Sequence, residues 1–179
     1  MWALFFNFWN NLHKLVKMTK ITATFIFTLA ILFCKAGDTA HLYNPGANAT
    51  EEIAKAVKQA KKENKFVLIQ AGGNWCSWCL RFNKFVTDDV QLDSIVNASF
   101  VVYHLNYSKE NLNKEVFAKY GYPQRFGFPV FIILDNNGNR LNTQNSAYLE
   151  EGKGYNKDKV FEFFKNWVPA ALDAKSYKN

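Results

Sequence analysis

Two cysteines, Cys76 and Cys79, follow closely after a short apolar run, Phe66–Gln70. A run of this length and composition is typical of a strand that is buried on both faces of a sheet. Two glycines end the run, and we expect a helix to begin at Cys76 and to continue to about Val86. The sequence therefore predicts a strand, a tight turn and a helix, with both thiols in the first turn of the helix.

The rest of the chain alternates between helical and strand patterns. Asn48 and Glu51 are typical of an N-cap with its capping-box acid, and apolar residues recur behind them at helical spacing. Asp135–Gly138 is a turn signal, in which Asn137-Gly138 suits a type I′ hairpin. Helices are expected over 49–64, 89–97, 111–120 and 157–168, and strands over 100–105, 130–134 and 140–143. Strands separated by helices and closed by a hairpin predict one α/β domain, in which helices cover both faces of a central mixed sheet.

The net charge of the chain is +7, but its distribution argues against a nucleic-acid partner. Four of the 22 basic residues and none of the 15 acidic residues lie in 1–36, which leaves +3 for 37–179. Beyond residue 36 the basic residues form no run longer than Lys61-Lys62, which we expect at the solvated end of a helix. Nucleic-acid binding is therefore not expected.

The N-terminal segment has the pattern of a secretory signal. Ile21–Phe33 is thirteen residues long and uncharged, which is too short for the ~20 residues that span a bilayer, and Lys20 precedes it. A cut after Ala36 would follow small residues, and Met18 stands where such a signal normally begins. We therefore expect residues 1–36 to be an N-terminal extension and signal peptide, and the working domain to lie outside the cytoplasm.

Two alternatives stay open for this segment. It could remain uncleaved as a membrane anchor, or Cys34 could be lipidated, although bulky Phe33 does not fit the small residue found there in bacterial lipoprotein signals. Removal of the signal leaves Cys76 and Cys79 as the two cysteines of the chain. The remaining segments are expected to be a linker over 37–47, a domain over 48–169 and a C-terminal tail over 170–179.

The cysteine pair carries the chemistry that we predict for this chain. Free backbone N–H groups and a partial positive charge at a helix N-terminus favour a thiolate, so Cys76 is expected to be an exposed nucleophile with a low pKa. Cys79 lies one turn deeper on the same face and can reach back to Cys76. The pair can thus cycle between a dithiol and a disulfide through a mixed disulfide with a partner.

Other uses of a CxxC pair are less favoured. Structural zinc needs four ligands, and beyond residue 36 the chain adds only His41 and His104 to the two cysteines. A static structural disulfide is disfavoured because so short a loop constrains the unfolded chain little. A carrier for a soft ion such as Cu(I) is a further alternative. We expect no metal ion at the pair.

Residues 75–79 (WCSWC), after an apolar strand, resemble the WCxxC active site of the thioredoxin family. They are most similar to the secreted bacterial thioredoxin-like proteins whose motif reads WC-x-WC. The resemblance covers roughly residues 43–168 and implies a thioredoxin fold. The family also has a cis-proline that faces the cysteines just before a central strand, and Pro129, which precedes Val130–Leu134, matches it. Pro123 is the competing position, but it lies too far from the strand.

Two positions that would affect the deprotonation of Cys79 differ from the family. The family commonly has a buried Asp six residues before the first Cys, which helps to deprotonate the second Cys. Gln70 stands there in this chain and cannot act as a base, whereas His104 stands where the family has a nearby buried Lys. We expect His104, directly or through a water, to accept the proton of Cys79, so that His104 and Gln70 are the candidate proton relay. The alternative is a histidine that is merely packed on a strand.

The residue before the proline also differs from the family. Phe128 precedes Pro129 where thioredoxins usually have a β-branched residue, so the groove beside Cys76 is expected to be more apolar. Trp75 and Trp78 would add aromatic surface to the same rim, although Trp78 could equally be packed against its helix. Trp75, Trp78, Phe128 and Pro129 are therefore the candidate substrate-binding residues.

The resemblance implies an exported thiol–disulfide oxidoreductase, with reduction of its substrates as the favoured direction. Protein thiols and disulfides would be its partners, a membrane-embedded thiol carrier its electron donor, and the redox-active Cys76–Cys79 disulfide its sole redox group, with no further cofactor. We expect a monomer that is periplasmic or secreted, with a membrane tether through the N-terminal segment as an alternative. The rival interpretation, kept open by Gln70, is a thioredoxin-like protein-binding module that does not turn over.

Overall fold

The computed structural model describes residues 41–178. The predicted signal peptide, with Met18 and Cys34, and the first part of the predicted linker lie outside the described residues, so these predictions stay open. Within the described range, no helix combines the length and the apolar character that crossing a membrane requires.

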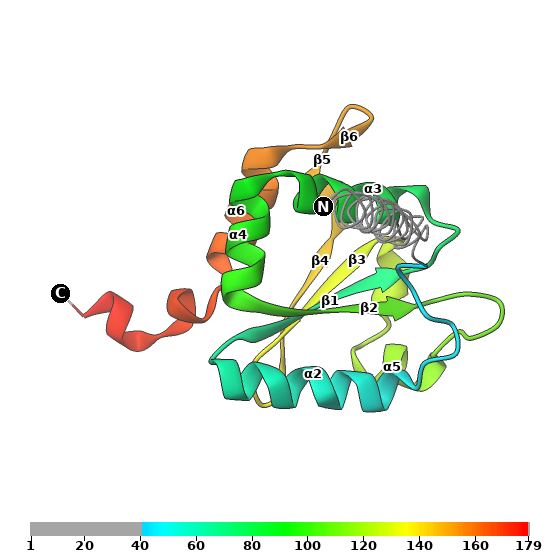
Figure 1. Ribbon diagram of the computed structural model, residues 1–179, viewed down its shortest axis with the longest axis horizontal. Coiled ribbons are helices and arrows are strands. Elements are labelled where there is room, and N and C mark those ends of the chain that lie inside the picture. Colours follow the sequence, from blue (N-terminus) through cyan, green and yellow to red (C-terminus); the bar gives the residue numbers. More distant parts are fainter. Residues whose placement is uncertain (1–40, 179) are drawn as a thin grey trace, which may run out of the picture. The chain divides into compact units, whose positions relative to one another are not determined.

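A four-stranded mixed sheet forms the centre of the domain, with the strand order β2-β1-β3-β4 (Figure 1). Strand β1 pairs parallel with β2 and antiparallel with β3, and β3 pairs antiparallel with β4. The strands are β1 (Phe66–Gly72), β2 (Phe100–Asn106), β3 (Val130–Leu134) and β4 (Arg140–Asn145). The parallel pair β1–β2 is joined through two helices, because parallel strands need a long crossover connection.

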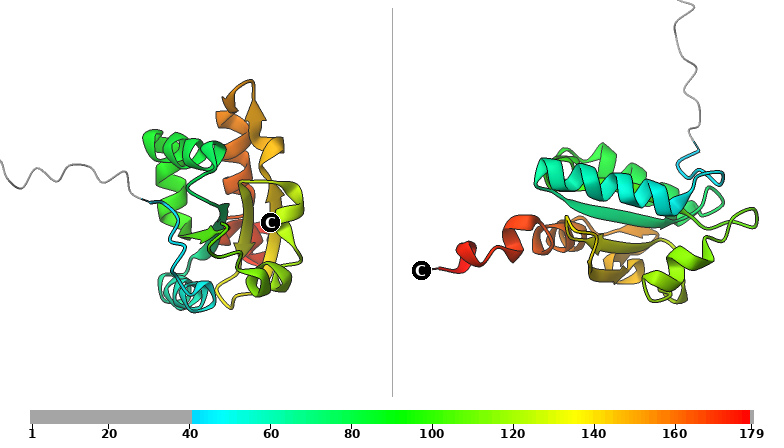
Figure 2. Two further views of the ribbon diagram at one scale, coloured as in Figure 1. Left: turned by 90° about the vertical axis from the view of Figure 1, so that its right-hand side faces the viewer. Right: turned by 90° about the horizontal axis from the view of Figure 1, so that it is seen from below.

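Helices cover both faces of this sheet (Figures 1 and 2). One face carries α2 (Ala49–Glu63) and α5 (Lys114–Lys119), and the other carries α3 (Ser77–Asp88), α4 (Val90–Ser99) and α6 (Lys157–Asn166). Each face has its own hydrophobic cluster. This arrangement confirms the predicted fold class, a central mixed sheet with helices on both faces.

Strand β1 lies at the centre because its side chains are apolar on both faces. Val67, Ile69 and Ala71 are fully buried in the cluster under α2, whereas Leu68 is buried in the cluster under α3. The glycines were expected to end this strand after Gln70, but β1 continues through Gly72, which pairs with Asn106 of β2. The extension carries the strand up to the cysteine motif.

Two local predictions are wrong for identifiable reasons. Helix α5 is shorter than the predicted 111–120, because Asn113 has a left-handed backbone (φ 47°) and its N–H is taken by the side chain of Asn111 (3.0 Å). The turn over Asp135–Gly138 is not type I′, which needs positive φ at both central residues. Only Gly138 in this turn has positive φ (85°), and the Asp135 carboxylate accepts the N–H of Asn137 instead (2.9 Å).

Short elements complete the C-terminal part of the domain. The segment before α6 contains a small hairpin, β5 (Glu150–Glu151) and β6 (Gly154–Tyr155), whose turn uses Gly152 with a left-handed φ of 57°. After α6, two 3₁₀ turns, η3 (Pro169–Leu172) and η4 (Ala174–Tyr177), extend away from the sheet (Figure 2).

Candidate active site

The first turn of α3 holds both cysteines. Cys76 is the N-cap of the helix, and its Sγ accepts the backbone N–H of Cys79 (3.1 Å). The two sulfurs form a disulfide, with a Cα–Cα distance of 5.2 Å. The side chain of Cys79 is completely buried. Of the two cysteines, Cys76 is the one that keeps some exposed surface.

The exposure of Cys76 is smaller than the sequence suggested. We expected an exposed nucleophile, but only 6% of Cys76 is accessible in the disulfide form. The cause is the cluster that Cys76 forms with Tyr43 and Cys79, against which Trp78 and Phe128 pack. Cys76 therefore keeps little surface for an approaching partner.

Phe128 packs against the cluster that contains both cysteines, and Pro129, which is buried, directly precedes β3. The Phe128–Pro129 peptide bond is cis, as predicted, and it is the one cis bond among the described residues. Pro123, the competing position, instead opens a short 3₁₀ turn, η1 (Pro123–Phe126). Phe128 joins the cluster around the cysteines, so its side chain contributes apolar surface next to them.

The two tryptophans of the motif have different surroundings. Trp75 is 60% exposed, its indole N–H donates to the Tyr107 carbonyl (2.7 Å), and its ring meets Phe128 edge to face (5.7 Å between centroids). Trp78 is half-buried, and its ring contacts Tyr155 (5.5 Å). Trp75 thus lies at the surface beside the disulfide, whereas much of Trp78 is taken up by packing.

Gln70 makes two hydrogen bonds beneath the pair. Its Nε2 donates to the backbone carbonyl of Cys79 (2.9 Å) and to the hydroxyl of Tyr43 (2.7 Å). Because a carbonyl oxygen can only accept, the amide nitrogen must face Cys79, which fixes the orientation of the side chain. Gln70 therefore holds two neighbours in place at the position where the family commonly has an acid.

His104 pairs in register with Gln70 on the neighbouring strand β2. Its Nε2 is shut off from solvent and has no hydrogen-bond partner among the described residues, and its ring meets Tyr43 edge to face (5.5 Å). Burial lowers the pKa of His104 to about 4. A base this weak is a poor proton acceptor near neutral pH, and the proton role of His104 stays a prediction.

Tyr43 is a site residue that sequence reasoning missed. It was placed in the linker over 37–47, but its side chain is completely buried against Cys76 and Cys79. Asn74, in the loop before the motif, holds its backbone with two hydrogen bonds, from Tyr43 N–H (3.0 Å) and to Tyr43 carbonyl (2.8 Å). Leu42-Tyr43 is the one large apolar pair in an otherwise small and polar stretch, a signal that could have indicated burial.

Gly72 allows the close approach of these groups. A Cβ at this position would overlap Cys79 Sγ and would stand 2.9 Å from the Tyr43 hydroxyl. The sulfur and the hydroxyl therefore lie against the same backbone atom at the end of β1. Only a residue without a side chain leaves them this room.

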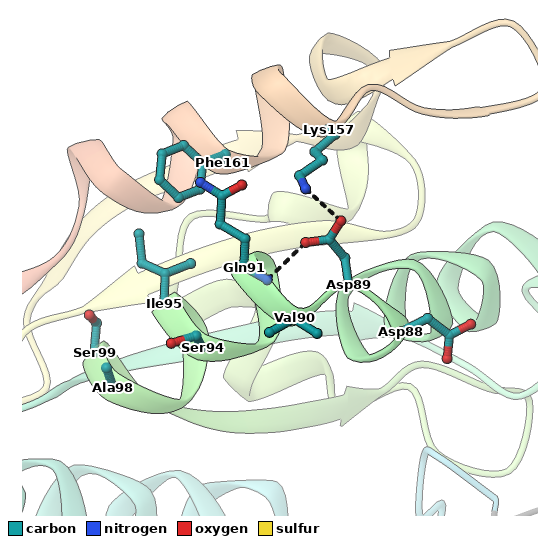
Figure 3. Close-up of a pocket in the computed structure, with 10 residues that line it drawn as sticks. All are labelled: Asp88, Asp89, Val90, Gln91, Ser94, Ile95, Ala98, Ser99, Lys157 and Phe161. Carbon is teal, nitrogen blue, oxygen red and sulfur yellow. Dashed lines mark hydrogen bonds and ion pairs between the residues drawn. The ribbon is translucent and has the colours of Figure 1, made fainter.

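A hollow elsewhere in the domain carries no such chemistry. It lies between α4 and α6 (Figure 3) and contains none of the predicted site residues. Its main charged groups are already paired: Lys157 lies 2.8 Å from Asp89, whose carboxylate also caps α4 through Gln91 N–H (3.0 Å). Within residues 41–178, no three His, Cys, Asp or Glu side chains are grouped so that they could hold a metal ion.

Comparisons with known proteins give a family match and matches to solved structures. A model of the thioredoxin-like domain matches residues 53–151. A search of curated proteins finds no match. Among solved structures, a disulphide isomerase from Xylella fastidiosa Temecula1 is 22% identical, with a TM-score of 0.63, over 72% of this chain and 98% of that one. The oxidised C-terminal domain of DsbD from Neisseria meningitidis is 19% identical, with a TM-score of 0.48, over 65% and 94%.

The structural likeness to the Xylella protein shows a shared fold, and the family match spans more than half of the chain. The CxxC disulfide at the start of α3 and the cis-proline before β3 are placed as the resemblance in the sequence implied. The chain belongs to the thioredoxin-like domain family.

Proposed function

We propose that this chain is an exported thiol–disulfide oxidoreductase that reduces disulfides of partner proteins. The observation that carries the proposal is the Cys76–Cys79 disulfide at the start of α3, in which Cys79 is completely buried and Cys76 is 6% exposed. This difference in burial suits Cys76 to attack a substrate disulfide and Cys79 to resolve the mixed disulfide that forms. No cofactor is needed beyond the two sulfurs.

The reaction follows from thiol–disulfide exchange. The Cys76 thiolate attacks one sulfur of a substrate disulfide, so that a mixed disulfide forms and the other substrate sulfur leaves and takes a proton. Cys79 then loses its proton and attacks Cys76 Sγ, which restores the internal disulfide and releases the second substrate thiol. Two electrons pass from the pair to the substrate. A membrane-embedded thiol carrier would return them by the same exchange.

Aromatic surface beside Cys76 supports an apolar, extended substrate segment. Exposed Trp75 and half-buried Phe128 meet edge to face, and Pro129 follows Phe128 at the start of β3. Apolar rings of this kind supply contact area without fixing a particular sequence. We therefore assign substrate contact to Trp75, Phe128 and the accessible part of Trp78, and to the chain at Pro129, which is itself buried.

The surroundings of Cys76 Sγ support reduction as the direction. Strong oxidants of this class stabilise the thiolate of the reduced form. Here one backbone N–H, that of Cys79, donates to Cys76 Sγ among the described residues. With this single donor beside the helix N-terminus, the thiolate would be less stabilised than in a strong oxidant, which favours the disulfide and gives a reducing pair. The proposal that the protein is exported rests on the signal-peptide pattern of residues 1–36. For its assembly state we propose a monomer.

Two measurements test this function. Full-length protein with dithiothreitol is expected to accelerate the precipitation of reduced insulin over the uncatalysed rate. Equilibration in graded thiol buffers, followed by Trp75 and Trp78 fluorescence, is expected to give a potential near about −270 mV. A value near about −120 to −180 mV would instead identify an oxidant or isomerase.

A binding module that does not turn over is the second candidate. Gln70 favours it, because the position that commonly holds an acid carries an amide engaged in two hydrogen bonds. A chain of this kind would leave the insulin reaction at the uncatalysed rate and would show no reversible redox transition. It would still bind its partner after both cysteines are replaced by serine.

A further inference from the structure

The segment 41–45 passes the carboxyl ends of β1 and β2 before α2 begins (Figure 1), and we call it the strap. Asn74 holds the backbone of Tyr43 by two hydrogen bonds, and Asn111 donates to the Pro45 carbonyl (3.0 Å). The strap is thus attached to two separate loops. These contacts hold the Tyr43 side chain over the buried member of the cysteine pair.

The hydrogen bonds of Gln70 determine which way the Tyr43 hydroxyl can donate. The Gln70 amide nitrogen faces the Cys79 carbonyl, so its second hydrogen goes to the Tyr43 oxygen. The phenol oxygen is therefore an acceptor in this bond. Among the hydrogen bonds of the described residues, none has the Tyr43 hydroxyl as donor. The hydroxyl hydrogen is therefore free to bond to a group other than Gln70.

Cys79 Sγ is the reactive group next to this hydroxyl. Both atoms crowd the position that a Cβ on Gly72 would occupy. In the disulfide form this sulfur is neutral and a weak acceptor. When Cys79 becomes a thiolate, the same sulfur carries a full charge in a site without solvent contact, and a hydrogen bond to a charged group is then worth most.

We propose that the Tyr43 hydroxyl donates a hydrogen bond to the Cys79 thiolate and so supplies stabilisation at a site that has Gln70 where the family commonly has an acid. This proposal rests on the proposed function, because it concerns the resolving step of that reaction. In this step Cys79 gives up its proton, forms a bond to Cys76 Sγ and displaces the substrate sulfur, which takes up a proton. Tyr43 keeps its own proton throughout.

Among residues 41–178, few titratable groups face this site. Besides Cys76, they are His104 on β2, which meets the Tyr43 ring, and Tyr155 on β6, whose charge would act on Tyr43. His104 is the rival, as a proton acceptor for Cys79. The two assignments differ in chemistry. Tyr43 would keep its proton and donate a hydrogen bond to the thiolate, whereas His104 would remove the proton from the Cys79 thiol.

The first experiment measures the pKa of Cys79 directly. The full chain with Cys34→Ser and Cys76→Ser keeps Cys79 as its single thiol, and the ultraviolet absorbance of the thiolate reports its titration. Tyr43→Phe is expected to raise the pKa by about one unit, a tenfold loss of thiolate. Tyr120→Phe is the matched control, because Tyr120 is equally buried but lies in the cluster under α2. It is expected to leave the pKa unchanged.

The second experiment separates attack from resolution. Reduced full-length protein with Cys34→Ser is mixed with an aromatic disulfide that releases one coloured thiolate when Cys76 attacks and a second when Cys79 resolves. Tyr43→Phe is expected to slow the second phase about tenfold and to leave the first phase unchanged. Its thermal unfolding, compared with that of Tyr120→Phe, reports whether the variant folds.

A fluorinated tyrosine at position 43 extends the test in the opposite direction. It keeps the hydroxyl and makes it a stronger donor, so the pKa of Cys79 is expected to fall and the second phase to accelerate. An unchanged Cys79 pKa in both Tyr43 variants would overturn the proposal, and a shift in His104→Ala would then assign the role to His104. Failure of the wild-type chain to reduce insulin would count against the proposed function instead, because the Cys79 titration needs no turnover.

Discussion

The two faces of strand β1 make an instructive contrast. Toward α2 the strand presents Val67, Ile69 and Ala71, all completely buried among apolar neighbours. Toward α3 it presents Leu68 and then, at its carboxyl end, the polar side chain of Gln70. One strand thus contributes to a wholly apolar core on one face and to a mixed polar site on the other.

This difference separates stability from chemistry. Apolar burial on the α2 face stabilises the fold and leaves no group free to react. On the α3 face the end of the strand holds Gln70 and Gly72, and beside them lie His104, Tyr43 and the cysteines. Changes on the first face should alter unfolding alone, whereas changes on the second should alter the redox reaction.

The largest effect is expected from the sulfurs themselves. Cys76→Ser removes the attacking group, so insulin reduction should fall about a thousandfold or more, to the uncatalysed rate. Cys79→Ser keeps the attack but removes resolution, so a mixed disulfide with the substrate should accumulate and be visible by mass spectrometry. If both variants reduced insulin as fast as the wild type, the roles assigned to the two cysteines would be wrong.

Ile132→Ala tests the apolar face. Ile132 of β3 is completely buried in the cluster under α2, so its truncation should lower the free energy of unfolding by about 2–5 kcal/mol. Denaturant unfolding measures this loss. The reduction potential of the folded variant should stay at the wild-type value, and a shift in potential would show that the two faces are not independent.

Gly72→Ala tests the polar face at its tightest point. The new Cβ would overlap Cys79 Sγ and crowd the Tyr43 hydroxyl, so unfolding should become easier by about 1–3 kcal/mol and the reduction potential should change as well. Gly154→Ala is the matched control. Gly154 has no atom within 4 Å of its Cβ position and should tolerate alanine without either effect.

The smallest effect concerns pH. Burial lowers the pKa of His104 from its ordinary value of 6.5 to about 4, so between these values the unfolded chain binds more protons than the folded one. The free energy of unfolding should therefore be full above about pH 6.5 and fall by about 1–2 kcal/mol by about pH 5. His104→Phe should lose this part of the pH dependence. Parallel pH curves for the two proteins would show that His104 titrates normally.

Local patterns were sufficient for much of the architecture. The apolar run at 130–134 became β3 with the same ends, and the bounds of α2 differ from the prediction by a single residue, because the Asn48 cap and the apolar spacing are both local. The cis bond at Phe128–Pro129 was implied by the resemblance to the thioredoxin family rather than by a local pattern. Helix α5 was overextended because the left-handed turn at Asn113 depends on a hydrogen bond with Asn111.

Patterns along the chain were enough to predict the order of the elements, the central mixed sheet and the position of the two cysteines at the start of a helix, since each depends on neighbouring residues. The surroundings of the two sulfurs depend instead on contacts between distant segments. Tyr43, Gln70 and His104 lie far apart in sequence and meet because β1 and β2 end together and the strap crosses them. Burial and hydrogen-bond direction at that meeting point arise from packing, and no local pattern encodes them.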